Sequence, residues 1–180
     1  MKLSISNIAW DKEQDQAVYT LMQKYGYKGL EIAPSRVIPQ NPYEKLQTVS
    51  EWAEELETEE GFVISSMQSI WYGKSENIWG SAEERSLLIK YTEKAVAFAN
   101  AVKCRHLVFG CPRNRNMPEN IVISDQNSQN SSNGRNDHSK TEINTVINTK
   151  IETVTDFFGE ICNYAAKHEV MIGLKANPKI

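Results

Sequence analysis

The feature that most constrains this chain is the alternation of short apolar runs with longer amphipathic stretches. Apolar runs of strand length occur at residues 3–10, 29–33, 62–67, 106–110 and 170–174. In the stretches between them, apolar residues recur at the three- and four-residue spacing of a helix. Parallel strands need a crossover connection, which is usually a helix and has one hand. The sequence therefore predicts an α/β fold with a parallel sheet of about five strands.

Local signals mark where several of these helices begin. Asp11 with Gln14, and Ser81 with Glu84, have the residue types and the spacing of a capping box. An Asn-Pro pair at residues 41–42 is typical of another helix start. The first helix is expected to bury a stripe of four side chains: Val18, Leu21, Met22 and Tyr25.

The segment from residue 116 to residue 140 differs in composition from the rest of the chain. It is rich in Asn, Ser, Gln and Asp, so we predict a polar, flexible loop that buries little apolar surface. Apolar residues recur at helical spacing again from residue 143 to residue 165. We expect one domain, residues 1–180, with the loop inside it. A closed eight-stranded (β/α) barrel usually takes about 250 residues, so a parallel (β/α) TIM-barrel-type fold built from this sequence is expected to be incomplete.

Charge and cysteine content argue against several classes of protein. The chain has 20 Lys and Arg against 23 Asp and Glu, and therefore offers no basic surface to a nucleic-acid backbone. Its three cysteines have neither the spacing of a metal knuckle nor the density of a disulfide framework. The N-terminal residues do not resemble a signal peptide, and no apolar stretch reaches membrane-spanning length. We expect a cytoplasmic protein that binds neither nucleic acid nor membrane.

Polar side chains at the ends of the predicted strands form the candidate site, because α/β folds bind ligands at the carboxyl ends of parallel strands. Glu31 can bind a metal ion or a sugar hydroxyl, or can simply pair with a nearby cation. Gln68 offers a donor and an acceptor to a sugar hydroxyl, or serves to order its loop. Trp71 can stack on a sugar face, and packing in the core is the alternative.

The fourth and fifth predicted strands are followed by cationic and amide side chains. Arg113 and Arg115 can present forked donors to a phosphate or a carboxylate, or can form surface ion pairs. Asn177 follows the fifth strand and completes the predicted substrate-binding residues. No phosphate-cradling glycine loop, nucleophile motif or histidine cluster accompanies them.

Four segments carry a resemblance to a known family: Gly-Leu-Glu-Ile-Ala-Pro-Ser-Arg at 29–36, Ser-Met-Gln-Ser-Ile-Trp-Tyr-Gly at 66–73, His-Leu-Val-Phe-Gly-Cys-Pro-Arg-Asn-Arg at 106–115 and Ile-Gly-Leu-Lys-Ala-Asn-Pro at 172–178. Together they resemble the xylose isomerase-like TIM barrel superfamily, and its sugar phosphate isomerase/epimerase members in particular. The resemblance implies a small-molecule sugar or sugar phosphate as substrate. It also implies a divalent metal (Mn, Mg, Zn or Co) that polarises a ketose carbonyl while a proton moves between carbons.

The sequence departs from the family in two respects. Lys175 stands where the family has a metal-ligating Glu, and the further ligands of the family come from later strands. We therefore expect that this chain does not bind the metal. The alternatives are a non-catalytic, truncated half-barrel and an endonuclease-like metal-dependent hydrolase, and the acidic charge balance counts against the second. An open half-barrel leaves two sheet edges unpaired, so self-association is expected.

Overall fold

One parallel sheet organises the computed structural model, which describes the backbone of residues 3–116 and 137–175 and the side chains of residues 3–116 and 148–175. Its strands are β1 (Ser4–Ser6), β2 (Gly29–Ile32), β3 (Val63–Met67), β4 (His106–Phe109) and β5 (Met171–Leu174). They pair in the order β1-β2-β3-β4-β5, and every pair is parallel. The predicted α/β fold with five parallel strands is confirmed.

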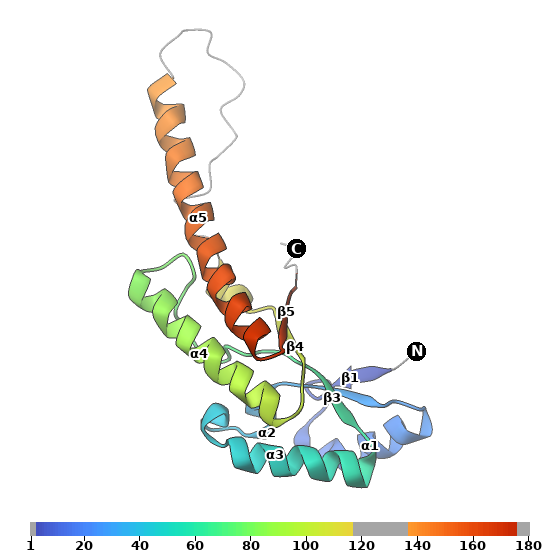
Figure 1. Ribbon diagram of the computed structural model, residues 1–180. Coiled ribbons are helices and arrows are strands. Elements are labelled where there is room, and N and C mark those ends of the chain that lie inside the picture. Colours follow the sequence, from blue (N-terminus) through green and yellow to red (C-terminus); the bar gives the residue numbers. More distant parts are fainter. Residues whose placement is uncertain (1–2, 117–136, 176–180) are drawn as a thin grey trace, which may run out of the picture.

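Helices connect each strand to the next and lie along one side of the sheet (Figure 1). The connections are η1 (Lys12–Gln14) with α1 (Asp15–Lys24), then α2 (Pro34–Val37), η2 (Pro42–Glu44), α3 (Leu46–Glu55) and η3 (Leu56–Glu60), then α4 (Ala82–Ala101), and finally η4 (Pro112–Arg115) with α5 (Asp137–Lys167). None of the helices in the described part of the chain is long and apolar enough to cross a membrane.

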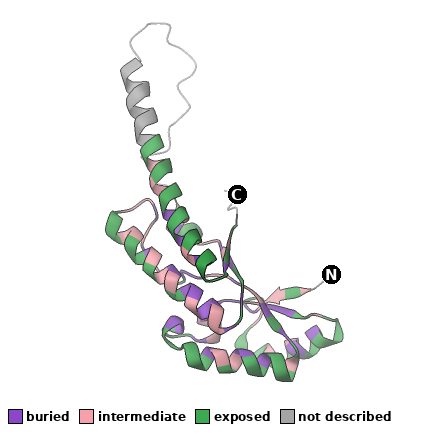
Figure 2. Cartoon of the chain, in the orientation of Figure 1, coloured by how far each residue is buried: buried purple, intermediate pink, exposed green. Residues whose placement is uncertain are grey.

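The core lies between the sheet and these helices, where buried segments of both face each other (Figure 2). Leu30 and Ile32 of β2 are fully buried, and so are Leu107 and Phe109 of β4. Because side chains alternate along a strand, Glu31 between the two buried β2 residues must face the other side of the sheet. The helix-covered face is therefore the apolar one, and the second face is free to carry polar groups.

The second face of the sheet is lined by small and polar side chains. A Cβ added at Gly29 would lie 3.0 Å from the Cβ atoms of both Ser4 and Ser65, so neighbouring strands converge closely on this face. A register shift between Leu30 and Glu31 interrupts the pairing of β2 with β3. It lets the consecutive residues Ser65 and Ser66 both bond to side chains of this face. The shift is thus how β3 contributes two hydroxyls in a row.

The first strand and the second helix differ from the predicted bounds. The predicted strand 3–10 ends at Ser6, because the chain turns where Ala9 N–H donates to the Ser6 carbonyl at 3.0 Å. The Asn-Pro pair at 41–42 begins only the short η2, and α3 starts at Leu46. The α4 start is as predicted, since Ser81 Oγ accepts from the Glu84 N–H.

Two further expectations need correction. Leu21 and Tyr25, which were predicted to be buried in the first helix, are 51% and 64% exposed, because only one side of α1 meets the sheet. Of the predicted loop 116–140, residues 117–136 lie outside the described residues, and 137–140 form the first turn of α5 instead.

Candidate functional site

A polar network occupies the carboxyl ends of the first three strands. Glu31 accepts two hydrogen bonds, from Gln68 Nε2 at 2.8 Å and from Ser66 Oγ at 2.9 Å. Gln68 Nε2 also donates to Ser6 Oγ at 2.5 Å. The structure therefore brings together Glu31 and Gln68, two of the predicted site residues. Both of the donors to Glu31 are neutral. Among the described residues its carboxylate forms no ion pair, so the pairing with a nearby cation is not observed there.

A pocket of about 410 Å³ opens beside this network, between the loops that follow β3 and β4. It is lined by Gln68, Ser69, Trp71, Tyr72, Gly73, Lys74, Val108, Gly110, Cys111, Pro112, Arg113, Asn114, Arg115 and Lys175. Ligand pockets commonly have about 300 to 1,000 Å³, so this volume suits a small molecule. Gln68 is the residue that belongs to both the pocket and the polar network.

Asn114 fixes the two loops that form the pocket walls. Its side chain is buried, and Nδ2 donates to the backbone carbonyls of Lys74 at 3.0 Å and Glu76 at 2.8 Å. The backbone carbonyl of Asn114 accepts from the backbone N–H of Ile78. Sequence reasoning did not single out this residue, because an asparagine between two arginines reads as an ordinary loop residue. Only its burial reveals its role.

Arg115 is held from several directions at the far wall of the pocket. Its Nη2 donates to the carbonyl of Lys175 at 2.9 Å, and its guanidinium carbon lies 5.6 Å from the ring centroid of Phe109. Its own carbonyl accepts from the indole N–H of Trp79 at 3.0 Å. Arg113 lines the same pocket with an exposed side chain. The structure thus places both predicted arginines at one pocket.

The aromatic residues after β3 divide between core and pocket. Trp71 is 2% exposed, donates from its indole N–H to Thr92 Oγ1 at 2.9 Å, and packs edge-on against Phe109. Trp71 also lines the pocket, but so buried a side chain has little surface to offer a ligand, which favours the core alternative over sugar stacking. Tyr72, the next residue, is 73% exposed and lines the pocket. Its side chain is the aromatic surface that is open to a ligand.

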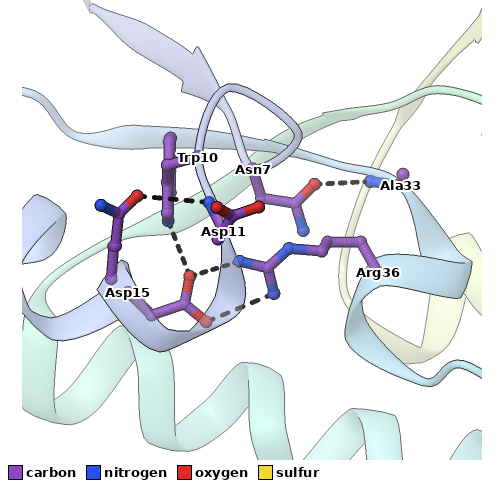
Figure 3. Close-up of polar contacts among 7 residues, drawn as sticks. Asn7, Trp10, Asp11, Asp15, Ala33 and Arg36 are labelled. Atoms are coloured by element: carbon purple, nitrogen blue, oxygen red, sulfur yellow. Dashed lines mark hydrogen bonds and ion pairs between the residues drawn. The ribbon is translucent and has the colours of Figure 1, made fainter.

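A second polar cluster closes the carboxyl ends of β1 and β2 (Figure 3). Arg36 binds both carboxylate oxygens of Asp15, with the shorter contact at 2.7 Å, and Trp10 donates from its indole N–H to the same carboxylate. Nearby, the Oδ1 atom of buried Asn7 accepts from the N–H of Ala33 at 3.0 Å. The contacts of Arg36 and Asn7 run between the segments that follow β1 and β2, so the cluster orders both loops.

The described residues do not offer a metal site. They contain no group of three or more His, Cys, Asp or Glu side chains that could hold a metal ion. Lys175 follows β5 and lines the pocket, whereas Asn177 lies outside the described residues. Cys111 is the thiol of the pocket, and burial raises its pKa, which leaves it protonated near neutral pH.

Comparison with known proteins identifies the fold. No family model and no curated protein matches this chain. It is similar to a sugar phosphate isomerase/epimerase from Parabacteroides distasonis (TM-score 0.58, 14% identity, 96% of this chain and 50% of that one). It is also similar to the 3-keto-D-glucoside 4-epimerase of E. coli (0.59, 17%, 97% and 55%) and to a D-tagatose 3-epimerase-like protein (0.61, 14%, 100% and 54%).

These likenesses confirm the predicted (β/α) TIM-barrel-type fold. The chain spans about half the length of the solved structures that it matches. In the described residues, β1 and β5 end the strand order and do not pair with each other, so the sheet is open as predicted for an incomplete barrel.

Proposed function

We propose that this chain binds a sugar or a similar polyhydroxylated molecule at the carboxyl ends of its strands. The observation that carries this proposal is the hydrogen bond from Gln68 to Glu31 at the edge of the 410 Å³ pocket. Since Gln68 Nε2 is used by Glu31 and Ser6, its Oε1 is left as an acceptor that has no partner among the described residues. A sugar hydroxyl is a donor of the right kind.

The solved structures support a sugar as the ligand. Their names identify a sugar phosphate isomerase/epimerase, a 3-keto-D-glucoside epimerase and a D-tagatose epimerase-like protein. By this analogy we propose that the chain is related to enzymes that move a proton between carbons of a ketose or a sugar phosphate. Analogy of fold is a weaker warrant than the geometry of the site, so the sugar-binding proposal rests on Gln68 and Glu31.

A divalent metal, which such chemistry commonly uses to polarise a carbonyl, does not fit the described pocket. The pocket contains Lys74, Arg113, Arg115 and Lys175, and none of its lining residues is Asp, Glu or His. Four cations repel a divalent ion at the place where carboxylate ligands are needed. We therefore propose that the described residues bind the sugar without a metal of their own.

A non-catalytic binding protein is the second candidate function. The titratable groups in and beside the pocket favour it. Cys111 has a raised pKa, and Glu31 is the only carboxylate in the network beside the pocket. Neither provides the pair of acid and base groups that a proton transfer between two carbons requires. The described residues alone thus support binding better than turnover.

Calorimetric titration with D-fructose and D-tagatose tests the sugar-binding proposal. We expect saturable binding to the unmodified chain and a loss of about tenfold or more in Gln68→Ala, because a buried sugar hydroxyl would lose its acceptor. Gln40→Ala, at an exposed glutamine that borders neither the network nor the pocket, is the matched control. Equal weakening in the two variants, or no heat with either ketose, would contradict the proposal.

A further inference from the structure

We propose that the pocket between the loops after β3 and β4 is an oxyanion site, built to hold the phosphate or carboxylate group of a small ligand. Four cationic side chains line it: Lys74, Arg113, Arg115 and Lys175. No carboxylate is among its lining residues. In the part of the chain that the structure describes, none of the four forms an ion pair. No carboxylate among the described residues therefore neutralises their charge.

The cations converge from three separate segments of the chain. Lys74 comes from the loop after β3, where its ammonium group lies 4.2 Å from the centre of the Tyr91 ring. Arg113 and Arg115 belong to η4, and Lys175 directly follows β5. The residues that line the cavity thus bring positive charge to it and no negative charge. An anion in this cavity is attracted by that charge.

Arg115 brings to the pocket a guanidinium group that the described residues leave partly unpaired. Its Nε is buried and has no hydrogen-bond partner, whereas Nη2 of the same guanidinium is engaged by the Lys175 carbonyl. Buried donors are nearly always paired in folded proteins. Since Arg115 lines the pocket, an oxyanion there is a natural acceptor for the guanidinium, which binds phosphate and carboxylate with paired N–H groups.

The walls of the site are fixed before any ligand arrives. Asn114 ties the loop of residues 74–78 to η4, and Asn77 Nδ2 donates to the Asn116 carbonyl at 3.2 Å. Trp79 donates to the Arg115 carbonyl across the same seam. A site that is ordered in advance loses little conformational entropy on binding. This arrangement distinguishes the pocket from a surface on which exposed lysines happen to lie near one another.

The position of Gln68 indicates what the rest of the ligand is. Gln68 lines the pocket and belongs to the polar network of Glu31. An anion among the cations would therefore have the proposed hydroxyl acceptor, Gln68 Oε1, within the same cavity. The inference rests on the proposed sugar site and narrows its ligand to a sugar that carries an oxyanion. A phosphorylated sugar and a sugar acid share this chemistry.

The test is a calorimetric titration of the full chain with inorganic phosphate, D-fructose 6-phosphate, D-gluconate and D-fructose, at low and high salt. We expect saturable phosphate binding that weakens as salt rises. Arg113→Ala should weaken it by about tenfold or more, since it removes a forked donor. Arg113 is exposed and has no side-chain hydrogen bond or ion pair among the described residues, so this variant should fold.

The matched control is Arg105→Ala, which removes the same charge from the opposite end of β4, where Arg105 pairs with Glu169. We expect it to change phosphate binding by less than about twofold, since Arg105 does not line the pocket and salt screens a distant exposed charge. Equal weakening in both variants, or no saturable binding of phosphate, overturns the inference.

The ligand panel separates the two proposals. If phosphate binds and the sugar part of D-fructose 6-phosphate adds nothing, the oxyanion site stands and the sugar-binding proposal fails. If D-fructose binds as tightly as its phosphate and inorganic phosphate does not compete, the sugar site stands and the oxyanion inference fails. D-gluconate distinguishes the two sources of the oxyanion, since binding stronger than that of D-fructose 6-phosphate would assign a carboxylate.

Discussion

At the scale of single residues, polar side chains that are buried or partly buried determine the shape of the pocket. Asn114 joins two loops through three backbone groups, and Glu31 accepts from Gln68 and Ser66. Such groups cost free energy when they are left without a partner in a buried place. Their partners therefore have to be in position whenever the chain is folded, which keeps the loops and strand ends in one arrangement.

Replacing Asn114 by alanine should lower the free energy of unfolding by about 2 kcal/mol, because two partly buried backbone carbonyls lose their donor. Urea denaturation monitored by tryptophan fluorescence measures the loss. Asn163→Ala, at an exposed asparagine of α5, is the control and should change stability by less than about 0.5 kcal/mol. If the two variants unfold at the same urea concentration, Asn114 does not hold the loops together.

Tyr19 gives the protein a stability limit at alkaline pH. Burial, assisted by the negative charge of Asp15, raises the pKa of its phenol to about 12, and its ring packs edge-on against Phe62. The unfolded chain releases this proton near pH 10, so the unfolded state binds fewer protons than the folded state between pH 10 and 12. The contribution of Tyr19 to stability is therefore complete below pH 10 and is lost as the pH rises toward 12.

We expect Tyr19→Phe to lose less stability than the unmodified chain between pH 10 and pH 12, by about 2 kcal/mol, because it has no proton to release. Denaturant unfolding at a series of pH values gives this difference. Tyr25→Phe removes a phenol that is 64% exposed, and its pH profile should follow that of the unmodified chain. Identical profiles for all three proteins would mean that Tyr19 ionises normally.

At the scale of elements, what the sequence predicts well is what depends on neighbours along the chain. The start of α4 is predicted because Ser81 and Glu84 bond to each other's backbone within one turn. Glu31 and Gln68 are predicted as site residues because strand ends can be located from apolar runs. The burial of Trp71 is not evident, since it depends on Thr92 of α4 and Phe109 of β4, which approach only in the folded chain.

The cap of α4 permits a direct test at this scale. Ser81→Ala removes the acceptor of the Glu84 N–H and should lower the free energy of unfolding by about 1 kcal/mol. Thermal unfolding followed by circular dichroism is the measurement. Ser86→Ala makes the same replacement at an exposed position inside α4, where alanine is the better helix former, and should be neutral or slightly stabilising. A loss in Ser86→Ala as large as that in Ser81→Ala would argue against the cap.

At the scale of the whole molecule, the open sheet is the main consequence of the incomplete barrel. β1 and β5 are the end strands of the described sheet, and β5 carries Met171 and Leu174 with 63% and 58% of their surface exposed. Unpaired backbone groups beside exposed apolar side chains form a template for another strand. We propose that these edges support the self-association expected from the sequence.

Leu174→Lys should weaken self-association by about tenfold, because a charge on an edge strand opposes pairing with another chain. Light scattering and sedimentation velocity over a range of protein concentrations measure the effect. Leu87→Lys places the same charge on the exposed side of α4, away from the sheet edge, and should leave association unchanged. A monomer at every concentration, with or without the substitution, would rule out association through the edges.

The seam that joins the loop of residues 74–79 to residues 114–116 limits where related sequences can be recombined and which loops can be exchanged by engineering. Asn114 donates to the backbone of residues 74–76, and Asn77 and Trp79 donate to the backbone of residues 115–116, so each loop supplies what the other lacks. A recombination point between them would separate matched halves and leave buried groups unpaired. Loops that alter ligand choice should therefore be exchanged as one module, from the end of β3 through η4 with α4 included.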